Sequence, residues 1–340
     1  MCKKNVVGLF SGGLDSWLSA LLIKQQGFNV YLLHFVSPYF GYSEEKLEEI
    51  EQRLKERGLN LIVHKFGQDY IDNIVKNPKH GTGSAVNACV DCHSYMLQIA
   101  KKKMEELNAV FVFSGEVLAQ RPMSQRKEAL NMVEKESGLR GYLVRPLSAK
   151  LLKPTIPEQE GVLNREMLMD ISGRGRKRQF ELAEKFNLTT YPQPAGGCKF
   201  TDPNLTKRFN VMMETNKDLT WVELELLKWG RHFYLGDNFY FMTARDEKEV
   251  TRLYDYAKLG TIVEPKDAAG STGLLLNYNY DKVSLVPEKQ ALAGRIIARY
   301  TKTLGNGRSD IDMVYLDNGV KTNEAAVSAI SELELNNYRL

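Results

Sequence analysis

The feature that most constrains the fold is a glycine-rich turn between two apolar segments near the start of the chain. Residues 5–10, NVVGLF, form an apolar run typical of a buried parallel strand. The turn at residues 11–16, SGGLDS, follows at once, and residues 17–27 repeat apolar side chains at helical spacing. Adjacent glycines let backbone N–H groups surround a phosphate, and the next helix points its positive N-terminus at the same place. The segment therefore predicts a strand, an anion-binding turn and a helix.

The complete string is more informative than its glycines. Any Ser-Gly-Gly can make a tight turn with a helix cap, but SGGLDS resembles the PP-loop signature SGGxDS of the N-type ATP pyrophosphatases at each fixed position. It is not a Walker A sequence, because no Gly-Lys-Ser or Gly-Lys-Thr closes it. The resemblance implies cleavage of ATP to AMP and pyrophosphate, with Asp15 as a candidate catalytic residue that holds Mg²⁺ or orients the nucleotide. It also implies that ATP contacts Ser11, Gly12, Gly13, Asp15 and Ser16.

Strand-like and helix-like segments continue to alternate after this unit. The next strand-like segments are residues 29–36, 59–66 and 109–116. Such alternation predicts an α/β fold with a doubly wound parallel sheet, in which ligands bind outside the carboxyl ends of the strands. We therefore expect the turn at residues 11–16 and the segment 114–126 to face one cleft. Gly115 and Lys153 are further candidate contacts of ATP, although a surface lysine would give the same pattern at position 153.

Three of the four cysteines stand in segments that suggest chemistry. Cys89 and Cys92 form a Cys-x-x-Cys pair, and Cys198 follows a loop rich in proline and glycine. The pair alone is compatible with a redox dithiol, a zinc site, an iron–sulfur site or two buried thiols. Three thiolates suit a [4Fe–4S] cluster with one open iron, and two suit a persulfide relay. Zinc is less favoured because it would need a fourth ligand, for which the candidates are His93, His34 and Cys2.

The order of motifs over residues 1–205 resembles the tRNA-thiolating branch of the PP-loop proteins, kin to 2-thiouridine and 4-thiouridine synthases. The motifs are SGGLDS, NACVDCH, SGEVLAQRPMSQR, LVRPLSAKLLKPT, ISGRGRKRQFELAEKF and YPQPAGGCKFTD. Members that work without a cluster tend to have Asp-x-x-Cys where this chain has Cys89-x-x-Cys92. The resemblance therefore implies an enzyme, a tRNA thiouridine synthase, in which Cys89, Cys92 and Cys198 hold a [4Fe–4S] cluster and are catalytic.

Two groups of basic residues are candidates for contacts with RNA. Arg174, Arg176, Lys177 and Arg178 lie beside glycines, which suits phosphate contacts, although a solvated start of a helix has the same composition. The pattern changes after residue 205, and we predict a helical connector at residues 206–232 and a smaller α+β domain at residues 233–325. This last domain weakly resembles the RNA-binding domain of NFACT proteins. Arg295 and Arg299 lie one helical turn apart within it.

The remaining expectations concern location, partners and rival functions. No apolar window approaches the roughly 18 residues that a membrane span needs, so we expect a cytoplasmic protein without a membrane partner. The net charge of +4 permits a nucleic-acid partner without requiring one. No rhodanese-like segment is recognisable, so we expect sulfide or a sulfur-carrier protein to donate sulfur to tRNA. The rival hypotheses are a cluster-free persulfide thiolase, a PP-loop ligase acting on a small carboxylate, and a noncatalytic RNA-binding module.

Overall fold

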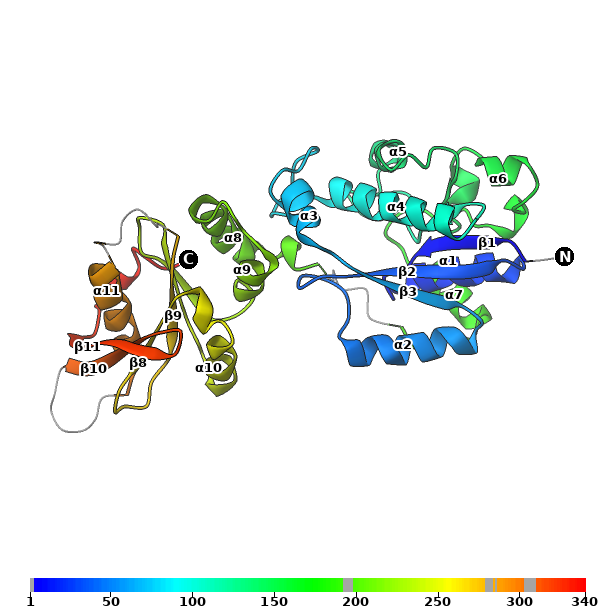
Figure 1. Cartoon of the computed structure of the whole chain (residues 1–340). Coiled ribbons are helices and arrows are strands. Elements are labelled where there is room, and N and C mark those ends of the chain that lie inside the picture. The colour runs from blue at the N-terminus through cyan, green and yellow to red at the C-terminus, as the bar shows by residue number, and fades with distance from the viewer. Residues whose placement is uncertain (1–2, 192–197, 279–283, 285, 303–309) are drawn as a thin grey trace. The chain divides into compact units, whose positions relative to one another are not determined.

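The computed structural model describes residues 3–191, 198–278, 284, 286–302 and 310–340. The chain divides into two compact units, Met1–Asp202 and Pro203–Leu340. The predicted division at residue 205 lies close to this point. The helices of the segment 206–232 fall within the second unit. Figure 1 labels the elements of both units.

A five-stranded parallel sheet forms the centre of the first unit, with the strand order β3-β2-β1-β4-β5. The strands are β1 (Asn5–Leu9), β2 (Asn29–Val36), β3 (Asn60–Lys65), β4 (Val112–Phe113) and β5 (Leu143–Val144). Its helices are α1 (Leu14–Gln25), α2 (Glu44–Glu56), α3 (Gln68–Tyr70), α4 (Cys89–Glu106), α5 (Lys127–Glu136), α6 (Ile156–Gln159) and α7 (Lys177–Lys185). The predicted doubly wound parallel sheet is therefore confirmed.

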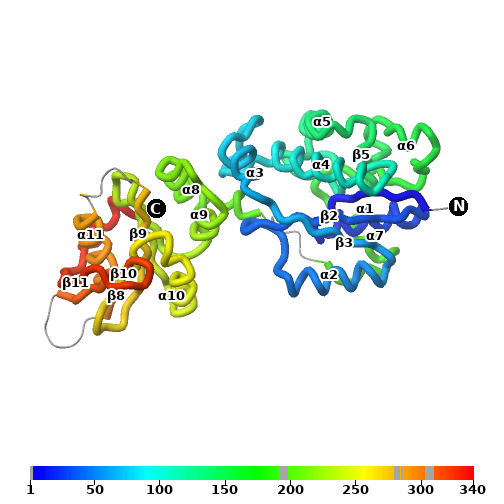
Figure 2. The backbone as a smooth tube through the Cα atoms, in the orientation of Figure 1, coloured from blue at the N-terminus to red at the C-terminus, as the bar shows by residue number. Residues whose placement is uncertain are grey.

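Helices cover both faces of this sheet. Figure 1 shows α4 and α5 on one side and α2 and α7 on the other, and Figure 2 traces the alternating path of strands and helices. The sheet is apolar throughout its centre: Val6, Val30 and Leu32 are fully buried, as are Trp17 and Leu18 of α1. Burial on both faces explains why β1 and β2 read as continuous apolar runs instead of alternating ones.

The strand order reverses between β1 and β4. Strand β1 pairs with β2 on one side and with β4 on the other, so the chain leaves the middle of the sheet in opposite directions. Loops that leave the carboxyl ends of two such strands diverge and leave a crevice between them. The turn after β1 and the segment after β4 both start at this crevice.

The second unit is built on a six-stranded antiparallel sheet in the order β11-β10-β8-β9-β7-β6. The strands are β6 (Arg231–Tyr234), β7 (Phe239–Thr243), β8 (Thr261–Pro265), β9 (Gly273–Asn277), β10 (Asp310–Asp317) and β11 (Val320–Ser328). The helices are α8 (Pro203–Thr215), α9 (Trp221–Leu226), α10 (Glu247–Tyr254), α11 (Val286–Arg299) and α12 (Glu332–Leu335). This arrangement confirms the predicted smaller α+β domain.

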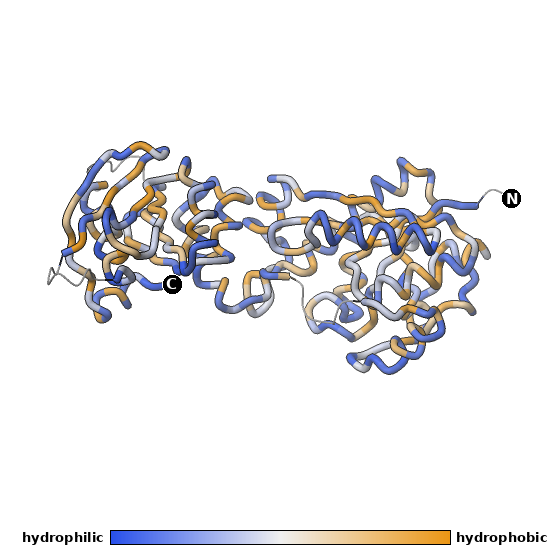
Figure 3. The backbone as a smooth tube through the Cα atoms, turned by 90° about the horizontal axis from the view of Figure 1, so that it is seen from below, coloured by the Kyte–Doolittle hydropathy of each residue, from blue (hydrophilic) through white to orange (hydrophobic). Residues whose placement is uncertain are grey.

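Helix α11 packs on the sheet through Ala293, Ile296 and Ile297, which are fully buried beside Phe233 and Phe241. Figure 3 shows hydrophobic and hydrophilic residues alternating along the helices, as expected for elements with one buried face. Within the described residues, no helix has the length and apolar character that crossing a membrane requires.

Gly8 tests how closely the central strands of the first unit pack. It pairs with Phe113 of β4, and a Cβ atom at position 8 would lie 2.1 Å from Cζ of that buried ring. We expect Gly8→Ala to lower the free energy of unfolding by about 1–3 kcal/mol, because the ring has no room to move. Urea denaturation measures this change.

The matched control is Gly175→Ala, since a Cβ there meets nothing within 4 Å. Its effect should stay within about 0.5 kcal/mol. Adding Phe113→Leu to Gly8→Ala should recover part of the loss, because the smaller side chain vacates the contested volume. Equal stability of Gly8→Ala and the wild type would contradict the packing described here.

Candidate functional site

The turn after β1 has the backbone of a phosphate-binding loop. Gly12 has a φ of +77°, a left-handed conformation that favours glycine. Ser11 Oγ accepts a hydrogen bond from the Gly13 amide at 3.4 Å, and Ser16 Oγ donates to the Gly13 carbonyl at 2.7 Å. Helix α1 begins at Leu14, so its N-terminal amides open at this turn. The amides of the turn and the N-terminus of the helix can therefore bind the same anion.

Gly115 lies directly against this turn. A Cβ atom at position 115 would stand 2.8 Å from the Ser16 amide nitrogen and 2.9 Å from the Asp15 carbonyl carbon. Only glycine lets the chain after β4 approach the first turn of α1 so closely. The structure thus brings Gly115 to the predicted ATP loop, while its contact with ATP stays a prediction.

Two residues from later in the chain hold the carboxylate of Asp15. Gln120 Nε2 donates a hydrogen bond to Asp15 Oδ2 at 3.1 Å. Arg176 Nη2 lies 3.4 Å from the same oxygen and forms an ion pair with it. Arg176 was predicted as an RNA contact, and the structure places it beside the nucleotide loop. Gln120 was not identified individually from the sequence. The sequence indicated only that the segment 114–126, to which it belongs, faces the cleft.

His34 and Tyr42 form a wall beside the same turn. Their rings stack with centroids 5.3 Å apart, and a Cβ atom on Gly12 would lie 2.6 Å from the Tyr42 ring. His34 Nδ1 lies 2.8 Å from the Phe10 carbonyl, which can only accept, so this nitrogen donates. Burial lowers the pKa of His34, which favours the neutral ring. His34 therefore supports the turn, a role different from the zinc ligand considered for it.

Cys89 and Cys92 lie in the first turn of α4, and both accept hydrogen bonds at sulfur. Asn87 Nδ2 lies 3.0 Å from Cys89 Sγ, and the Tyr70 hydroxyl lies 3.2 Å from Cys92 Sγ. Donors aimed at sulfur stabilise a thiolate or a metal-bound thiolate over a neutral thiol. Neither donor was identified from the sequence.

Cys198 reaches the same neighbourhood from the far end of the unit. The next residues anchor it: the Lys199 amide donates to the Tyr39 carbonyl at 3.0 Å, and Phe200 stacks on Tyr39 with centroids 4.2 Å apart. Residues 192–197, which precede Cys198, lie outside the described part of the chain, as does Cys2.

Burial and neighbouring cysteines affect the pKa of two of the thiols. Burial raises the pKa of Cys92 to about 12; the Tyr70 hydrogen bond opposes this rise, and negative charge on Cys198 and Cys89 adds to it. Burial also raises the pKa of Cys198 to about 11, again with a contribution from Cys89. The three sulfur atoms are therefore close enough to affect one another.

The donor set fits a thiolate-bound metal in its chemistry but is not assembled around one. Three thiols with hydrogen-bond donors at two of them are the ligand type that iron–sulfur clusters use. Among the described residues, however, no three His, Cys, Asp or Glu side chains are arranged to hold a metal ion.

His93, considered above as a fourth zinc ligand, belongs to a buried charge network. His93 Nδ1 lies 3.0 Å from Glu116 Oε1, and Arg145 Nε lies 2.9 Å from Glu116 Oε2. Burial would raise the pKa of Glu116, but the charge of Arg145 and the His93 hydrogen bond outweigh it and hold the pKa at about 2. Arg145 also contacts Glu134 at 3.1 Å. The network therefore joins His93, which follows Cys92 in the sequence, to Glu116, which follows Gly115.

The other predicted basic residues differ in their pairing. Arg178 pairs with Asp170, whereas Arg174 and Lys177 have no ion-pair partner among the described residues. Lys153 is exposed and forms no hydrogen bond or ion pair with the nucleotide turn in the part of the chain that the structure describes. Among the predicted site residues outside the turn that the structure describes, Arg176 and Gly115 are thus the ones that lie beside it.

In the second unit, helix α12 pairs with both predicted RNA-binding arginines. Arg295 makes two hydrogen bonds to Glu334, of 2.8 and 2.7 Å. Arg299 pairs with Glu332 at 2.6 Å and donates to the Ile330 carbonyl at 3.1 Å. Their contact with RNA stays a prediction.

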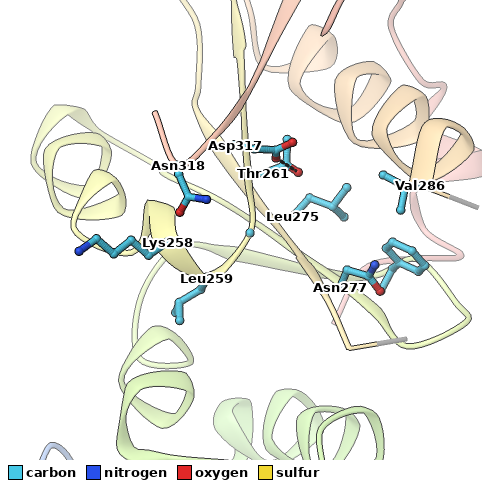
Figure 4. A pocket seen from close by; sticks show the side chains of 10 residues that line it. Lys258, Leu259, Thr261, Leu275, Asn277, Val286, Asp317 and Asn318 are labelled. Carbon is cyan, nitrogen blue, oxygen red and sulfur yellow. Dashed lines mark hydrogen bonds between the residues drawn. The ribbon is translucent and has the colours of Figure 1, made fainter. Parts of the chain in front are cut away.

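A pocket of about 240 Å³ lies in the second unit between β8, β9 and the turn after β10. Figure 4 shows Leu275 at its apolar floor and Asn277, Asp317 and Asn318 around it. The pocket contains none of the predicted site residues. The candidate site accordingly rests on the nucleotide turn and the three cysteines of the first unit.

The parallel sheet and the glycine turn after β1 give the first unit the α/β fold expected of a PP-loop domain. Residues 1–153 match the family profile described as thiamine biosynthesis protein (ThiI). Residues 230–339 match the NFACT protein RNA binding domain. The predicted resemblances of the two parts of the chain, to PP-loop proteins and to the NFACT domain, are therefore confirmed.

One curated relative is a probable tRNA sulfurtransferase of Lysinibacillus sphaericus (strain C3-41). It is 28% identical over 157 residues, which is 45% of this chain and 37% of the relative. The chain thus spans little more than a third of that relative.

Two solved structures were also similar to this chain. The U34-tRNA thiolase NcsA from Methanococcus maripaludis with its [4Fe–4S] cluster is 15% identical, with 67% of this chain and 71% of that chain covered and a TM-score of 0.36. A 4-thiouridine synthetase in complex with RNA and bound ATP is 22% identical, with 56% and 54% covered and a TM-score of 0.35. The resemblance of each unit to a known family rests on the two family profiles and not on these two structures.

The charge of Glu116 should stabilise the first unit. Glu116→Gln keeps the shape of the side chain but leaves the charge of Arg145, which is 3% exposed, with less compensation. We expect a loss of about 3 kcal/mol in the free energy of unfolding near neutral pH. Urea denaturation of the wild type and the variant gives the difference, with the exposed Glu181→Gln as the control.

The pH dependence of this difference has a defined sign. Because the folded-state pKa of Glu116 is about 2, below its ordinary value, the stabilisation is complete above the ordinary value and disappears as the pH falls toward 2. The difference between the wild type and Glu116→Gln should therefore shrink on acidification. A difference that stays constant down to about pH 3 would contradict the ionised, paired state of Glu116.

Proposed function

We propose that the protein is an ATP-dependent tRNA sulfurtransferase. In this proposal it adenylates a carbonyl oxygen of a uridine and replaces that oxygen with sulfur. The observation that carries the proposal is that one folded unit holds a PP-loop turn and three cysteines, two of which accept hydrogen bonds at sulfur from Asn87 and Tyr70. The match of residues 230–339 to an RNA binding domain supports RNA as the substrate.

Residues of the turn prepare ATP for cleavage at the α-phosphorus. The amides of Gly12 and Gly13, with the N-terminus of α1, hold the pyrophosphate and stabilise its charge as it leaves. The uridine carbonyl oxygen attacks the α-phosphorus, which forms an O-adenylated base and releases pyrophosphate. A sulfur nucleophile then adds at the activated carbon, and AMP leaves with the former carbonyl oxygen. Activation is needed because an amide-like carbonyl oxygen is a poor leaving group.

The three cysteines supply the sulfur side of the reaction. We assign Cys89, Cys92 and Cys198 as ligands of a [4Fe–4S] cluster, whose open iron would hold the sulfide to be transferred. Tyr70 and Asn87 orient the sulfur atoms of Cys92 and Cys89 through their hydrogen bonds. Sulfide or a sulfur-carrier protein donates the sulfur, and the reaction takes place on tRNA in the cytoplasm.

A cluster-free persulfide mechanism is the second candidate. It is favoured by the finding that no three potential ligands are arranged for a metal among the described residues. In that mechanism a sulfur-carrier protein transfers persulfide sulfur to one thiol, and this persulfide displaces AMP from the activated carbon. A second thiol then attacks the resulting disulfide and releases the thiocarbonyl, which leaves a Cys–Cys disulfide that an external dithiol reduces. Both candidates share the adenylation step, so they differ in the content of iron and sulfide and not in the product.

Contacts with tRNA are proposed for Arg174 and Lys177, which have no ion-pair partner among the described residues, and for Arg176 at the turn of residues 11–16. Two cations without carboxylate partners next to glycines can follow the phosphate backbone. Arg178, Arg295 and Arg299 would have to exchange their carboxylate partners for phosphate. Lys153 remains a proposed contact of ATP.

The activity predicts a tRNA-dependent release of pyrophosphate. We expect Asp15→Ala to lower this rate by about 10²-fold or more, because the carboxylate at the nucleotide turn is lost. Lys185 lies at the end of α7 that is farther from Arg176 and the nucleotide turn. Lys185→Ala should therefore leave the rate unchanged. Mass spectrometry of tRNA nucleosides from a deletion strain identifies the thiolated product. Pyrophosphate release that needs a small carboxylate and no tRNA would support the ligase hypothesis instead.

The cluster predicts a colour. Protein purified without oxygen should be brown, with visible absorbance and iron and sulfide in near-stoichiometric amounts, and Cys92→Ser should lose all of these. Cys2→Ser serves as the matched control and should keep them. Colourless, active protein with a persulfide on Cys89, Cys92 or Cys198 would establish the second mechanism, and bound zinc would contradict both.

A further inference from the structure

The strongest unassigned feature is a pair of oxygen atoms beside the nucleotide turn. Asp15 Oδ1 and Gln120 Oε1 are both buried, and neither has a hydrogen-bond partner among the described residues. A buried polar atom without a partner costs about 1–3 kcal/mol, so each of these atoms requires an explanation. Both are acceptors, since one belongs to a carboxylate and the other to an amide carbonyl.

A single hydrogen bond keeps the two groups together. Gln120 Nε2 donates to Asp15 Oδ2 at 3.1 Å, and this bond fixes which end of the amide faces Asp15, because two oxygens would repel. The carboxylate and the amide therefore each use one atom for the shared bond. The other atom of each group, an oxygen, is left for a ligand.

The backbone before Gln120 is held in an unusual conformation. Ala119 has a φ of +62°, which is uncommon for a residue with a side chain. Two hydrogen bonds maintain it: the Ala119 amide donates to the Gln125 carbonyl at 2.7 Å, and the Gln120 amide donates to the Val117 carbonyl at 3.2 Å. Such strain persists where the surrounding structure requires it, often at a functional site. Here it places Gln120 on Asp15.

The local charge shows which kind of ligand the pair suits. Arg176 lies 3.4 Å from Asp15 Oδ2 and compensates the carboxylate at that oxygen, which leaves Oδ1, without a hydrogen-bond partner among the described residues, as the oxygen open to a cation. Mg²⁺ prefers oxygen ligands and is usually held by one or two protein oxygens together with waters and phosphate oxygens. Two acceptor oxygens beside a phosphate-binding turn match this requirement. A nucleotide hydroxyl would need only one acceptor.

We propose that Gln120 is a metal ligand that supplies, beside Asp15, the second protein oxygen for the divalent cation accompanying ATP. The inference rests on the proposed ATP-dependent function and adds a residue to its nucleotide site. Because Gln120 belongs to the loop after β4, it ties this loop to the metal as well as to the turn after β1.

The test measures binding of α,β-methylene-ATP, which cannot be cleaved at the reacting bond, to the full chain. Calorimetry with Mn²⁺ and with EDTA gives the factor by which the metal tightens binding, and electron paramagnetic resonance counts free Mn²⁺. We expect Gln120→Met to reduce this factor about 10-fold or more and to leave binding in EDTA unchanged. Gln120→Glu keeps an oxygen at the position and should retain the factor. The exposed Gln159→Met is the matched control.

Other results would overturn the proposal. If Gln120→Met keeps the wild-type factor, Gln120 is not a ligand; if it weakens binding equally in Mn²⁺ and EDTA, Gln120 contacts the nucleotide itself. If Gln120→Met does not fold, Gln120→Glu decides, since loss of the factor in that folded variant excludes metal ligation. If the wild-type chain binds the analogue in neither condition, the proposed function fails together with this inference.

Discussion

The buried carboxylate of Glu116 connects the two halves of the candidate site. It directly follows Gly115, which touches the nucleotide turn, and it contacts His93, which directly follows Cys92. Arg145 neutralises the carboxylate from the end of β5, and neither side chain is more than 5% exposed. A charge at this depth is stable only when it is paired, and a shift of α4 relative to β4 would remove its contact with His93 and leave Arg145 as its charged partner. The position of the cysteine helix is thereby linked to the position of the nucleotide turn.

The surroundings of the thiols differ from those of an exposed redox pair. Reactive cysteines usually lie near cations that lower their pKa, whereas burial here raises the pKa of Cys92 and Cys198. A proton is therefore held tightly until something else stabilises the thiolate, such as a metal or a transferred sulfur. The Tyr70 hydrogen bond acts in that direction but does not outweigh burial. All three cysteines nevertheless remain partly exposed.

The sequence predicted local elements well and long-range partners poorly. The bounds of β2 agree with the predicted segment 29–36, because burial on both faces leaves a continuous apolar run. In contrast, the predicted strand at residues 109–116 is reduced to Val112–Phe113, since the chain turns away after β4 to place Gly115 on the nucleotide turn. Gln120 could not be assigned from its neighbours, because its partner Asp15 is distant in sequence and the bond depends on the reversed strand order.

The sequence also did not reveal the partners of charged residues. The energies of the ion pairs differ between the two units. Helical spacing correctly placed Arg295 and Arg299 on one face of α11, but it gave no sign of their partners Glu334 and Glu332. Each of these side chains is at least 33% exposed, so each pair contributes at most about 1 kcal/mol. Phosphate can replace a carboxylate at such a pair with little loss of stability, whereas replacing Glu116 leaves the buried charge of Arg145 with Glu134 as its remaining carboxylate partner among the described residues. The arginines of α11 can therefore exchange partners at a low cost in stability, as the proposed contact with RNA would require, while the network around Glu116 cannot.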